Sequence, residues 1–495
     1  MRWRYPALLF VVAVVTRIPF TSKLLYDQDA VQFALALEKY DVYLQQPHPP
    51  GYFLYVMAGK LINVFLHDAN VSFLILSVIG SGLTVVAVYY LATMIFDREA
   101  GLWAATLAVT SPLLWYFGEL ALTYVVAAFF NVWIAILSWK ILQRDLRWVY
   151  LSPMVLGIAA GIRQDLAMFL FPLWLFSVMA LKPKQVLTVG IILCVTVAAW
   201  FIPMLVMTGG TERYLLAVRE LWHFHNRTFS IWNAGIASRG HFFLAFFGNT
   251  SYGIGIGMIF LLLGLYALLR TGEWRRSRGK EILFFVLWLL PAFSFHMLVF
   301  MNPDHAGYSV FFLPALFVIL WPSVKYVLSE MGKALDRYHL ANTAICRATA
   351  VIIIVLNAMF FLLSDSVVSA KGIREHDNHL ASILQGIEKN FPPEATIIID
   401  DRSYQLYNYR HIQYYLRRYR VYLTALDSSE SEPWHILLGR NGQTFIVEKI
   451  EIPSEVRYVV HLANPLDRSN SDKLEAQNLN RLPLDQRNSL FYEIR

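Results

Sequence analysis

Long apolar stretches separated by short polar segments recur along most of the chain. Five of them approach or exceed the length of a membrane-crossing helix: residues 73–96, 186–207, 254–269, 282–301 and 349–363. About 20 apolar residues in a helix cross the roughly 30 Å hydrocarbon layer of a bilayer. The pattern therefore predicts a mainly α, polytopic membrane protein.

The basic residues between these stretches predict how the chain crosses the membrane. If residues 51–66 lie along the outer interface, the inner segments hold 17 Lys and Arg residues and the short outer loops hold one, Arg163. Counting 51–66 as a span reverses that asymmetry, against the tendency of cytoplasmic loops to be basic. Placing Arg163, Gln164 and Asp165 in an outer turn also divides 148–181 into two short spans. About eleven spans result, with the N-terminus inside and two large outer regions, 21–70 and 208–251.

The first apolar stretch has two interpretations. The sequence MRWRYPALLFVVAVV is typical of a first span, and it also resembles the basic and apolar regions of a cleaved signal peptide. No small-x-small cleavage site follows it. Under either interpretation the residues after Phe20 lie outside the cytoplasm.

From about Ser364 the chain becomes charged and lacks an apolar run of membrane-crossing length. Residues 395–400 and 444–452 are typical of strands, and 403–419 of a helix. We therefore expect a membrane domain over 1–364 and a small extracytoplasmic α/β domain over 365–495.

Composition agrees with a membrane protein and adds little about partners. The 495 residues are 57% hydrophobic and 16% charged, against about 25% charged in soluble domains. The net charge of +7 is explained by membrane orientation, so no nucleic-acid partner is expected. Cys194 and Cys346 are far apart in sequence and indicate neither a disulfide framework nor a metal cluster. The metal requirement is left open, and a divalent cation is compatible with the sequence.

The first outer region carries most of the candidate chemistry. Asp27 is placed to cap a helix that runs to about Tyr40, with Asp29 in its first turn. In the alternative interpretation both carboxylates only cap the helix. The following PHPP run holds His48 between prolines, which fix φ and favour an extended neighbour, so His48 is expected on a rigid turn facing the aspartates.

These motifs resemble a known family. The sequence DAVQF from Asp29, HPPGY from His48 and GKL from Gly59 look like the first outer loop of the dolichyl-phosphate-mannose–protein mannosyltransferases. The bacterial aminoarabinose–lipid A transferases have a related loop. The segments FDREAGL at 96–102 and TSPLL at 110–114 also resemble this type-C superfamily of membrane glycosyltransferases. Ala30 stands where the family has Glu, and Asp27 is an additional acid upstream.

The resemblance implies an enzyme of the plasma (inner) membrane that acts on the outer face. It would move a sugar, with inversion, from a polyprenyl-phosphate donor to a hydroxyl of a lipid, glycan or protein acceptor. Asp29 would be the general base, with Asp27 as the alternative. The donor phosphate would need cationic or donor groups. Arg163 is the first choice, and the other candidates are His48, Arg213, Arg219, Arg227 and Arg239, some of which could contact membrane lipids instead. Candidates for acceptor contact or for support of the site are Glu119, Tyr124, Asp304 and His305.

Two other classes of function compete with this one. In a lipid or solute transporter, charged residues would line a path across the membrane, but few ionisable residues fall in the middle of the predicted spans. In a non-catalytic assembly or sensor protein, the C-terminal domain would bind partners. The sequence contains no Walker or Rossmann glycine motif, so it gives no support to a nucleotide-sugar donor.

Overall fold

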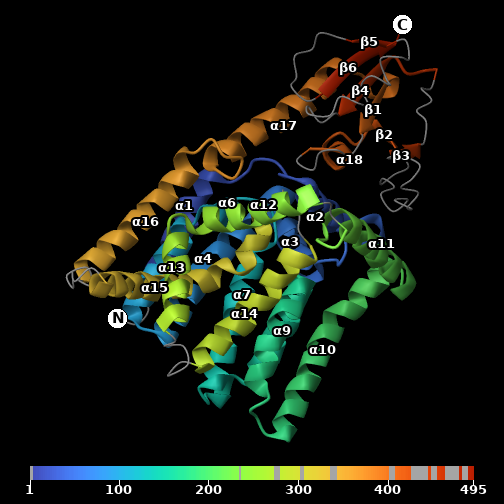
Figure 1. Cartoon of the computed structure of the whole chain (residues 1–495). Helices are drawn as coiled ribbons and strands as arrows, with labels where there is room; N and C mark the ends of the chain where they lie inside the picture. The colour runs from blue at the N-terminus through green and yellow to red at the C-terminus, as the bar shows by residue number, and fades with distance from the viewer. Residues whose placement is uncertain are drawn as a thin grey trace.

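The computed structural model describes residues 4–233, 236–271, 279–300, 306–334, 343–400, 407–424, 444–447, 454–462, 479–481 and 489–494 (Figure 1). A bundle of helices forms the body of the molecule. The C-terminal domain stands at one end of this bundle, connected to it by a long helix.

The bundle helices follow the predicted apolar segments closely. They are α1 (Arg4–Arg17), α4 (Ala69–Ile95), α5 (Arg98–Thr110), α6 (Pro112–Phe117), α7 (Tyr124–Leu142), α8 (Leu151–Ile162), α9 (Gln164–Val178), α10 (Pro183–Thr208), α13 (Gly257–Thr271), α14 (Gly279–Leu298), α15 (Leu313–Ala334) and α16 (Thr343–Leu363). The chain has the fold of a multi-pass membrane protein. The predicted turn at Arg163 separates α8 from α9. Here the three polar residues Arg163, Gln164 and Asp165 interrupt an otherwise apolar stretch.

In the part of the chain that the structure describes, fewer helices than the eleven expected spans are long and apolar enough to cross a membrane. Among the described residues six helices are long and apolar enough to cross a membrane, or seven if one bent pair counts as a single span. That pair bends by 107° between residues 239–254 and 257–270. The predicted stretch 254–269 therefore begins at a sharp corner, where Gly255 has a φ of +65°. Helices α8, α9 and α3 (Phe53–Leu66) belong to the shorter apolar class.

Side-chain caps specify the starts of several helices locally. Asp68 Oδ1 accepts a hydrogen bond from Val71 N at the start of α4, and Asp97 Oδ1 accepts one from Ala100 N at the start of α5. Such caps satisfy amide groups that have no partner within the helix. The same Asp97 belongs to the FDREAGL motif, so that motif has a structural reason as well as a family resemblance.

The two large outer regions contain helices rather than open loops. The first holds α2 (Gln28–Glu38) and α3, and the second holds α11 (Thr211–Phe229) and most of α12 (Ile236–Ile254). In Figure 1, α2, α3, α6 and α12 gather at the end of the bundle beneath the C-terminal domain.

The C-terminal domain consists of α17 (Ala370–Asn390), α18 (Tyr409–Tyr415) and a sheet. Its strands are β1 (Thr396–Asp400), β2 (Arg420–Thr424), β3 (Thr444–Val447), β4 (Tyr458–Leu462), β5 (Leu479–Arg481) and β6 (Ser489–Ile494). The sheet order is β3-β2-β1-β4-β6-β5. β1 pairs in parallel with β2 and β4, while β4 pairs with β6 in antiparallel.

Strand β1 covers 396–400 of the predicted strand 395–400, and β3 covers 444–447 of the predicted strand 444–452, whose remaining residues lie outside the described part. The predicted helix 403–419 is wrong in length. The described helix ends at Tyr415 and strand β2 begins at Arg420, and between them Tyr419 is buried in the core of the C-terminal domain. Residues 401–406 lie outside the described part. The division at 364/365 stays a prediction.

Candidate active site

The first turn of α2 holds two carboxyl groups in different environments. Asp27 is the N-cap: its Oδ1 accepts a hydrogen bond of 2.9 Å from Ala30 N, and the residue is 9% exposed. Asp29 lies two residues further on, and its side chain is 29% exposed. The local cap expected from the sequence is therefore made by Asp27.

Asp27 and Asp29 differ in how deeply their carboxyl groups are buried, and burial changes the pKa of Asp27. It raises the pKa of Asp27 from its usual 3.8 to about 8, assisted by the negative charge of Asp29, while hydrogen bonds from the amides of Ala30 and Asp29 act in the opposite direction. A carboxyl group with such a pKa holds its proton at neutral pH. Asp29 is the more accessible of the two.

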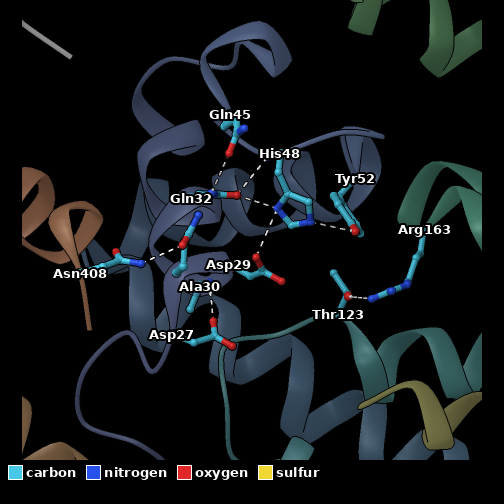
Figure 2. A network of polar contacts seen from close by, with 11 residues as sticks. Asp27, Asp29, Ala30, Gln32, Gln45, His48, Tyr52, Thr123, Arg163 and Asn408 are labelled. Atoms are coloured by element: carbon cyan, nitrogen blue, oxygen red, sulfur yellow. Dashed lines mark hydrogen bonds and ion pairs between the residues drawn. The ribbon is translucent and has the colours of Figure 1, made fainter. Parts of the chain in front are cut away.

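His48 lies directly beside Asp29 (Figure 2). Its Nδ1 is 2.6 Å from Gln32 Oε1 and 3.5 Å from Asp29 Oδ1, and its Nε2 is 3.0 Å from Tyr52 Oη. An amide oxygen can only accept, so Nδ1 carries the hydrogen. Burial raises the pKa of Tyr52, so the Tyr52 hydroxyl stays protonated and can donate to His48 Nε2.

The turn that carries His48 is fixed by contacts to its carbonyl groups. Pro50 O accepts from Gln164 Nε2 at 2.9 Å and from Tyr214 Oη at 3.2 Å, and Gly51 O accepts from Tyr40 Oη at 2.6 Å. Gly51 has a φ of +117°, and a Cβ there would lie 2.8 Å from Tyr40 Oη. Glycine is therefore required at this position.

Arg163 approaches the same region from the break between α8 and α9. It is 6% exposed; its Nε lies 2.9 Å and 3.1 Å from the two Asp165 oxygens, and its Nη1 donates to Thr123 Oγ1 at 3.0 Å. The guanidinium carbon is 5.6, 4.9 and 4.9 Å from the ring centroids of Tyr52, Tyr124 and Phe311, respectively. No hydrogen bond from Nη2 to a described residue is present.

Figure 2 shows how these side chains are arranged. Asp29, His48, Tyr52 and Arg163 converge from the first outer region and from the α8–α9 break, whereas Asp27 lies apart, on the far side of Ala30. Tyr52 connects the two halves, because its hydroxyl contacts His48 and its ring faces Arg163. The arrangement brings a carboxylate, an imidazole and a cation into one polar region.

The other predicted arginines are placed differently. The guanidinium group of Arg213 forms an ion pair with Asp41 at 3.2 Å and lies over the ring of Tyr43. Its positive charge is therefore balanced by the Asp41 carboxylate. Arg219 lies on α11, where its Nε is 3.5 Å from His223 Nε2. Arg239 lies in the first turn of α12. The side chain of Arg227 is outside the described part, as are Asp304 and His305.

Of the predicted supporting residues, one joins the site and one is enclosed. Tyr124 begins α7, and its ring faces Arg163. Glu119 is 0% exposed, and burial raises its pKa, opposed by the charge of Arg17. The backbone carbonyl of Glu119 accepts from Ser22 N at 2.9 Å. The side chain of Glu119 is therefore enclosed within the protein.

The site also contains three residues to which the sequence analysis gave no role: Gln32 and Tyr52, which lie within the DAVQF and HPPGY motifs, and Thr123. Gln32 is three residues after Asp29 and therefore lies on the same face of α2. This spacing could have predicted their proximity from the sequence. Tyr52 follows His48 by four residues, but their contact depends on the turn between them. Thr123 meets Arg163 only through the packing of α7 against α8 and α9. Within the described ranges, no group of three or more His, Cys, Asp or Glu side chains could hold a metal ion.

Comparison with known proteins gives a family match and a shared fold. Residues 39–187 match the N-terminal domain of TMEM260, described as a protein O-mannosyl-transferase. His48, Tyr124 and Arg163 fall inside the match, and Asp27 and Asp29 precede it. The structure of ArnT from Cupriavidus metallidurans bound to undecaprenyl phosphate has a TM-score of 0.59 to this chain at 13% identity, covering 100% of this chain and 98% of that one.

The fold is that of the type-C membrane glycosyltransferases. ArnT in the apo state gives the same result, with a TM-score of 0.53 at 13% identity over 98% of this chain and 97% of that one. A search of curated protein sequences gave no significant match. The expected resemblance to the mannosyltransferases and aminoarabinose transferases is confirmed by the family match and by the shared fold.

Proposed function

We propose that this protein transfers a sugar from a polyprenyl-phosphate donor to an acceptor hydroxyl on the extracytoplasmic face, with inversion. The observation that carries the proposal is the partly exposed Asp29 carboxylate, held on a capped helix turn beside His48 and facing the Arg163 region. Two findings support it: the fold is shared with ArnT, one of whose structures holds undecaprenyl phosphate, and the match to the TMEM260 domain covers His48 and Arg163.

In this proposal Asp29 is the general base. It accepts the proton of the acceptor hydroxyl as that oxygen attacks the anomeric carbon of the sugar. The attack comes from the face of this carbon opposite to the phosphate. The bond between the carbon and the phosphate oxygen breaks, and its electrons leave with the lipid phosphate. One displacement of this kind inverts the anomeric centre. A carboxylate near the developing positive charge on the sugar also stabilises the transition state.

Arg163 would bind the leaving phosphate. Its Nε and Nη1 are used by Asp165 and Thr123, which fix the plane of the guanidinium and leave Nη2 for the ligand. The surrounding rings of Tyr52, Tyr124 and Phe311 exclude water, so a charge-assisted contact there is stronger than one at the surface. A planar cation held in this way suits a phosphate group.

His48 would orient Asp29 rather than bind the phosphate. Its Nδ1–H lies between Gln32 Oε1 and Asp29 Oδ1 and can stabilise the carboxylate in one rotamer. The backbone N of His48 also donates to Gln32 Oε1, at 3.3 Å, so Gln32 fixes both the ring and the turn. This role differs from the phosphate contact that the sequence suggested for His48.

The test is a transfer assay with the purified protein in detergent or liposomes. A polyprenyl phosphate carrying a radiolabelled sugar is incubated with a panel of lipid, glycan and peptide acceptors, and the products are separated from the donor. We expect labelled acceptor and release of free polyprenyl phosphate by the parent, and neither with Asp29→Asn. Movement of the intact donor across a liposome membrane without cleavage would instead identify a transporter. Absence of both cleavage and movement would favour an assembly protein.

A further inference from the structure

The segment that leads into α2 is enclosed by the C-terminal domain on the side away from the membrane bundle. Residues 22–28 carry the chain from the end of the first bundle helix to the first turn of α2, where Asp27 and Asp29 lie. Side chains of α17 and of the α18 region form hydrogen bonds to the backbone and to the polar side chains of this segment. Figure 2 shows Asn408 beside the start of α2.

Helix α18 holds both backbone groups of Leu25. Leu25 N donates to Tyr415 Oη at 2.9 Å, and Leu25 O lies 3.2 Å from His411 Nε2. A carbonyl can only accept, so the hydrogen of His411 is on Nε2; its Nδ1 accepts from Asn408 N at 3.2 Å. Burial lowers the pKa of His411 to about 3, which keeps this ring neutral.

The residues on both sides of Leu25 are held as well. Asp377 of α17 accepts from Ser22 Oγ at 2.6 Å and from Lys23 N at 2.8 Å. Asn408 Nδ2 donates to Gln28 Oε1 at 2.7 Å, and Gln28 stands between the two aspartates at the start of α2. Bonds from the C-terminal domain thus reach residues 22, 23, 25 and 28.

The far end of α2 is held by the same helix region. Arg417 makes two bonds to Glu38, the last residue of α2, at 2.6 and 3.3 Å. Arg410, which is fully buried, donates from Nη2 to Leu44 O at 3.0 Å. Since α2 has only 11 residues, its stability and position depend on tertiary contacts of this kind.

We infer that α17 and α18 form a clamp that positions Asp29 against the Arg163 region. This inference rests on the proposed function for its catalytic consequence. Arg163 belongs to the membrane bundle, whereas Asp29 belongs to the short helix α2, which packs against α3, α4 and α18. The distance between base and donor phosphate therefore depends on how these contacts hold α2. Asp377, Asn408, His411 and Tyr415 are positioning residues, which act through α2 and do not touch the reacting atoms.

Tyr415→Phe tests the clamp, because it removes the hydroxyl bonded to Leu25 N and leaves the ring in place. Its matched control is Tyr419→Phe, which removes a hydroxyl bonded within the C-terminal domain, to Phe391 O at 2.7 Å. Gln28→Ala is a second variant that removes the Asn408 contact from the other partner. Hydrogen exchange of peptides covering 22–38 and the transfer kinetics are measured for all of them in the full-length protein.

We expect Tyr415→Phe and Gln28→Ala to exchange faster over 22–30 and to lose roughly tenfold or more in kcat, with donor KM near the parent value. Tyr419→Phe should match the parent in both measurements. Parental exchange over 22–30, or parental kcat, in both clamp variants would overturn the inference. If the parent itself transfers no sugar, the proposed function fails, and the exchange data still decide whether the C-terminal domain holds this segment.

Discussion

Asp27 and Asp29 are the same residue type two positions apart, and their surroundings assign them different tasks. Asp27 is buried, bonded to Ala30 N, and has a pKa raised by burial to about 8. Asp29 is more exposed and faces His48. Neighbouring carboxyl groups whose environments differ in this way commonly divide structural and chemical roles. Two substitutions to Asn separate these roles.

Asp29→Asn should abolish most of the transfer activity without unfolding the helix. Asparagine has the same shape but cannot accept the acceptor's proton, so we expect kcat to fall by about 10²–10⁴-fold. Donor binding and the thermal midpoint should remain those of the parent. Parental turnover by Asp29→Asn together with an inactive Asp27→Asn would move the base to Asp27, and parental turnover by both would exclude the carboxylate mechanism.

Asp27→Asn should change the pH dependence of stability. The folded-state pKa of Asp27 is raised above its usual 3.8 to about 8, so the folded protein binds this proton more tightly than the unfolded chain. That stabilisation is complete below about pH 4 and is lost as the pH rises through 8. The apparent thermal midpoint in detergent should therefore fall between pH 6 and pH 9 in the parent and fall less in Asp27→Asn, which keeps the cap. Equal slopes for the two proteins would contradict this assignment.

The Arg163 prediction must separate phosphate binding from the ion pair with Asp165. Removing Arg163 alone leaves Asp165 without its cation, so the informative variant is Arg163→Ala combined with Asp165→Asn. Loss of a charge-assisted contact costs about 1.5–3 kcal/mol, so the donor KM of the double variant should rise at least tenfold over that of Asp165→Asn. If the two have the same donor KM, Arg163 has only a structural role.

Among the elements, the turn between α2 and α3 determines where His48 lies. Its carbonyl groups at Pro50 and Gly51 accept hydrogen bonds from Gln164, Tyr214 and Tyr40, which come from three different parts of the chain. This turn therefore couples the first outer region to α9 and α11. The position of His48 depends on the turn as a whole.

Gly51→Ala should disrupt this turn. A Cβ at φ +117° would lie 2.8 Å from Tyr40 Oη and 2.9 Å from Met204 Sδ, and left-handed backbone of this kind costs about 1–3 kcal/mol for a non-glycine residue. We expect a lower thermal midpoint and reduced turnover. Gly190→Ala is the control, since it lies within α10 and its Cβ would meet nothing within 4 Å. A parental midpoint for Gly51→Ala would show that the turn can relax.

For the whole molecule, the orientation in the membrane stays a prediction from charge asymmetry. It places the candidate site and the C-terminal domain outside the cytoplasm. In a variant lacking Cys194 and Cys346, a cysteine at the exposed Lys389 of α17 should react with an impermeant thiol reagent on intact cells. A cysteine at Lys184, near the opposite end of the bundle, should react only after permeabilisation. The reverse pattern would invert the topology.

Several features of the fold follow from short stretches of sequence. Hydropathy over about 20 residues is sufficient for a bilayer, so the class and most bundle helices were predictable. The cap at Asp27 joins residues three apart, and strands β1 and β3 show as compact apolar runs. The shorter extent of α18 was not predictable, because the continuous Tyr- and Arg-rich pattern does not show that Tyr419 turns into the core of the C-terminal domain.

In the candidate site, too, some features could be predicted from the sequence and others could not. The sequence by itself determined a multi-pass membrane protein, and it pointed to Asp27, Asp29 and His48 as the candidate chemistry of residues 21–70. Only the tertiary structure decided that Asp27 is buried and Asp29 accessible, that Arg213 is paired with Asp41, and that Arg163 meets Tyr52. It also joined Leu25 to Tyr415, which are 390 residues apart. Local patterns fix which residues form a helix or face a bilayer, whereas burial, pairing and distance between segments depend on packing that no single segment specifies.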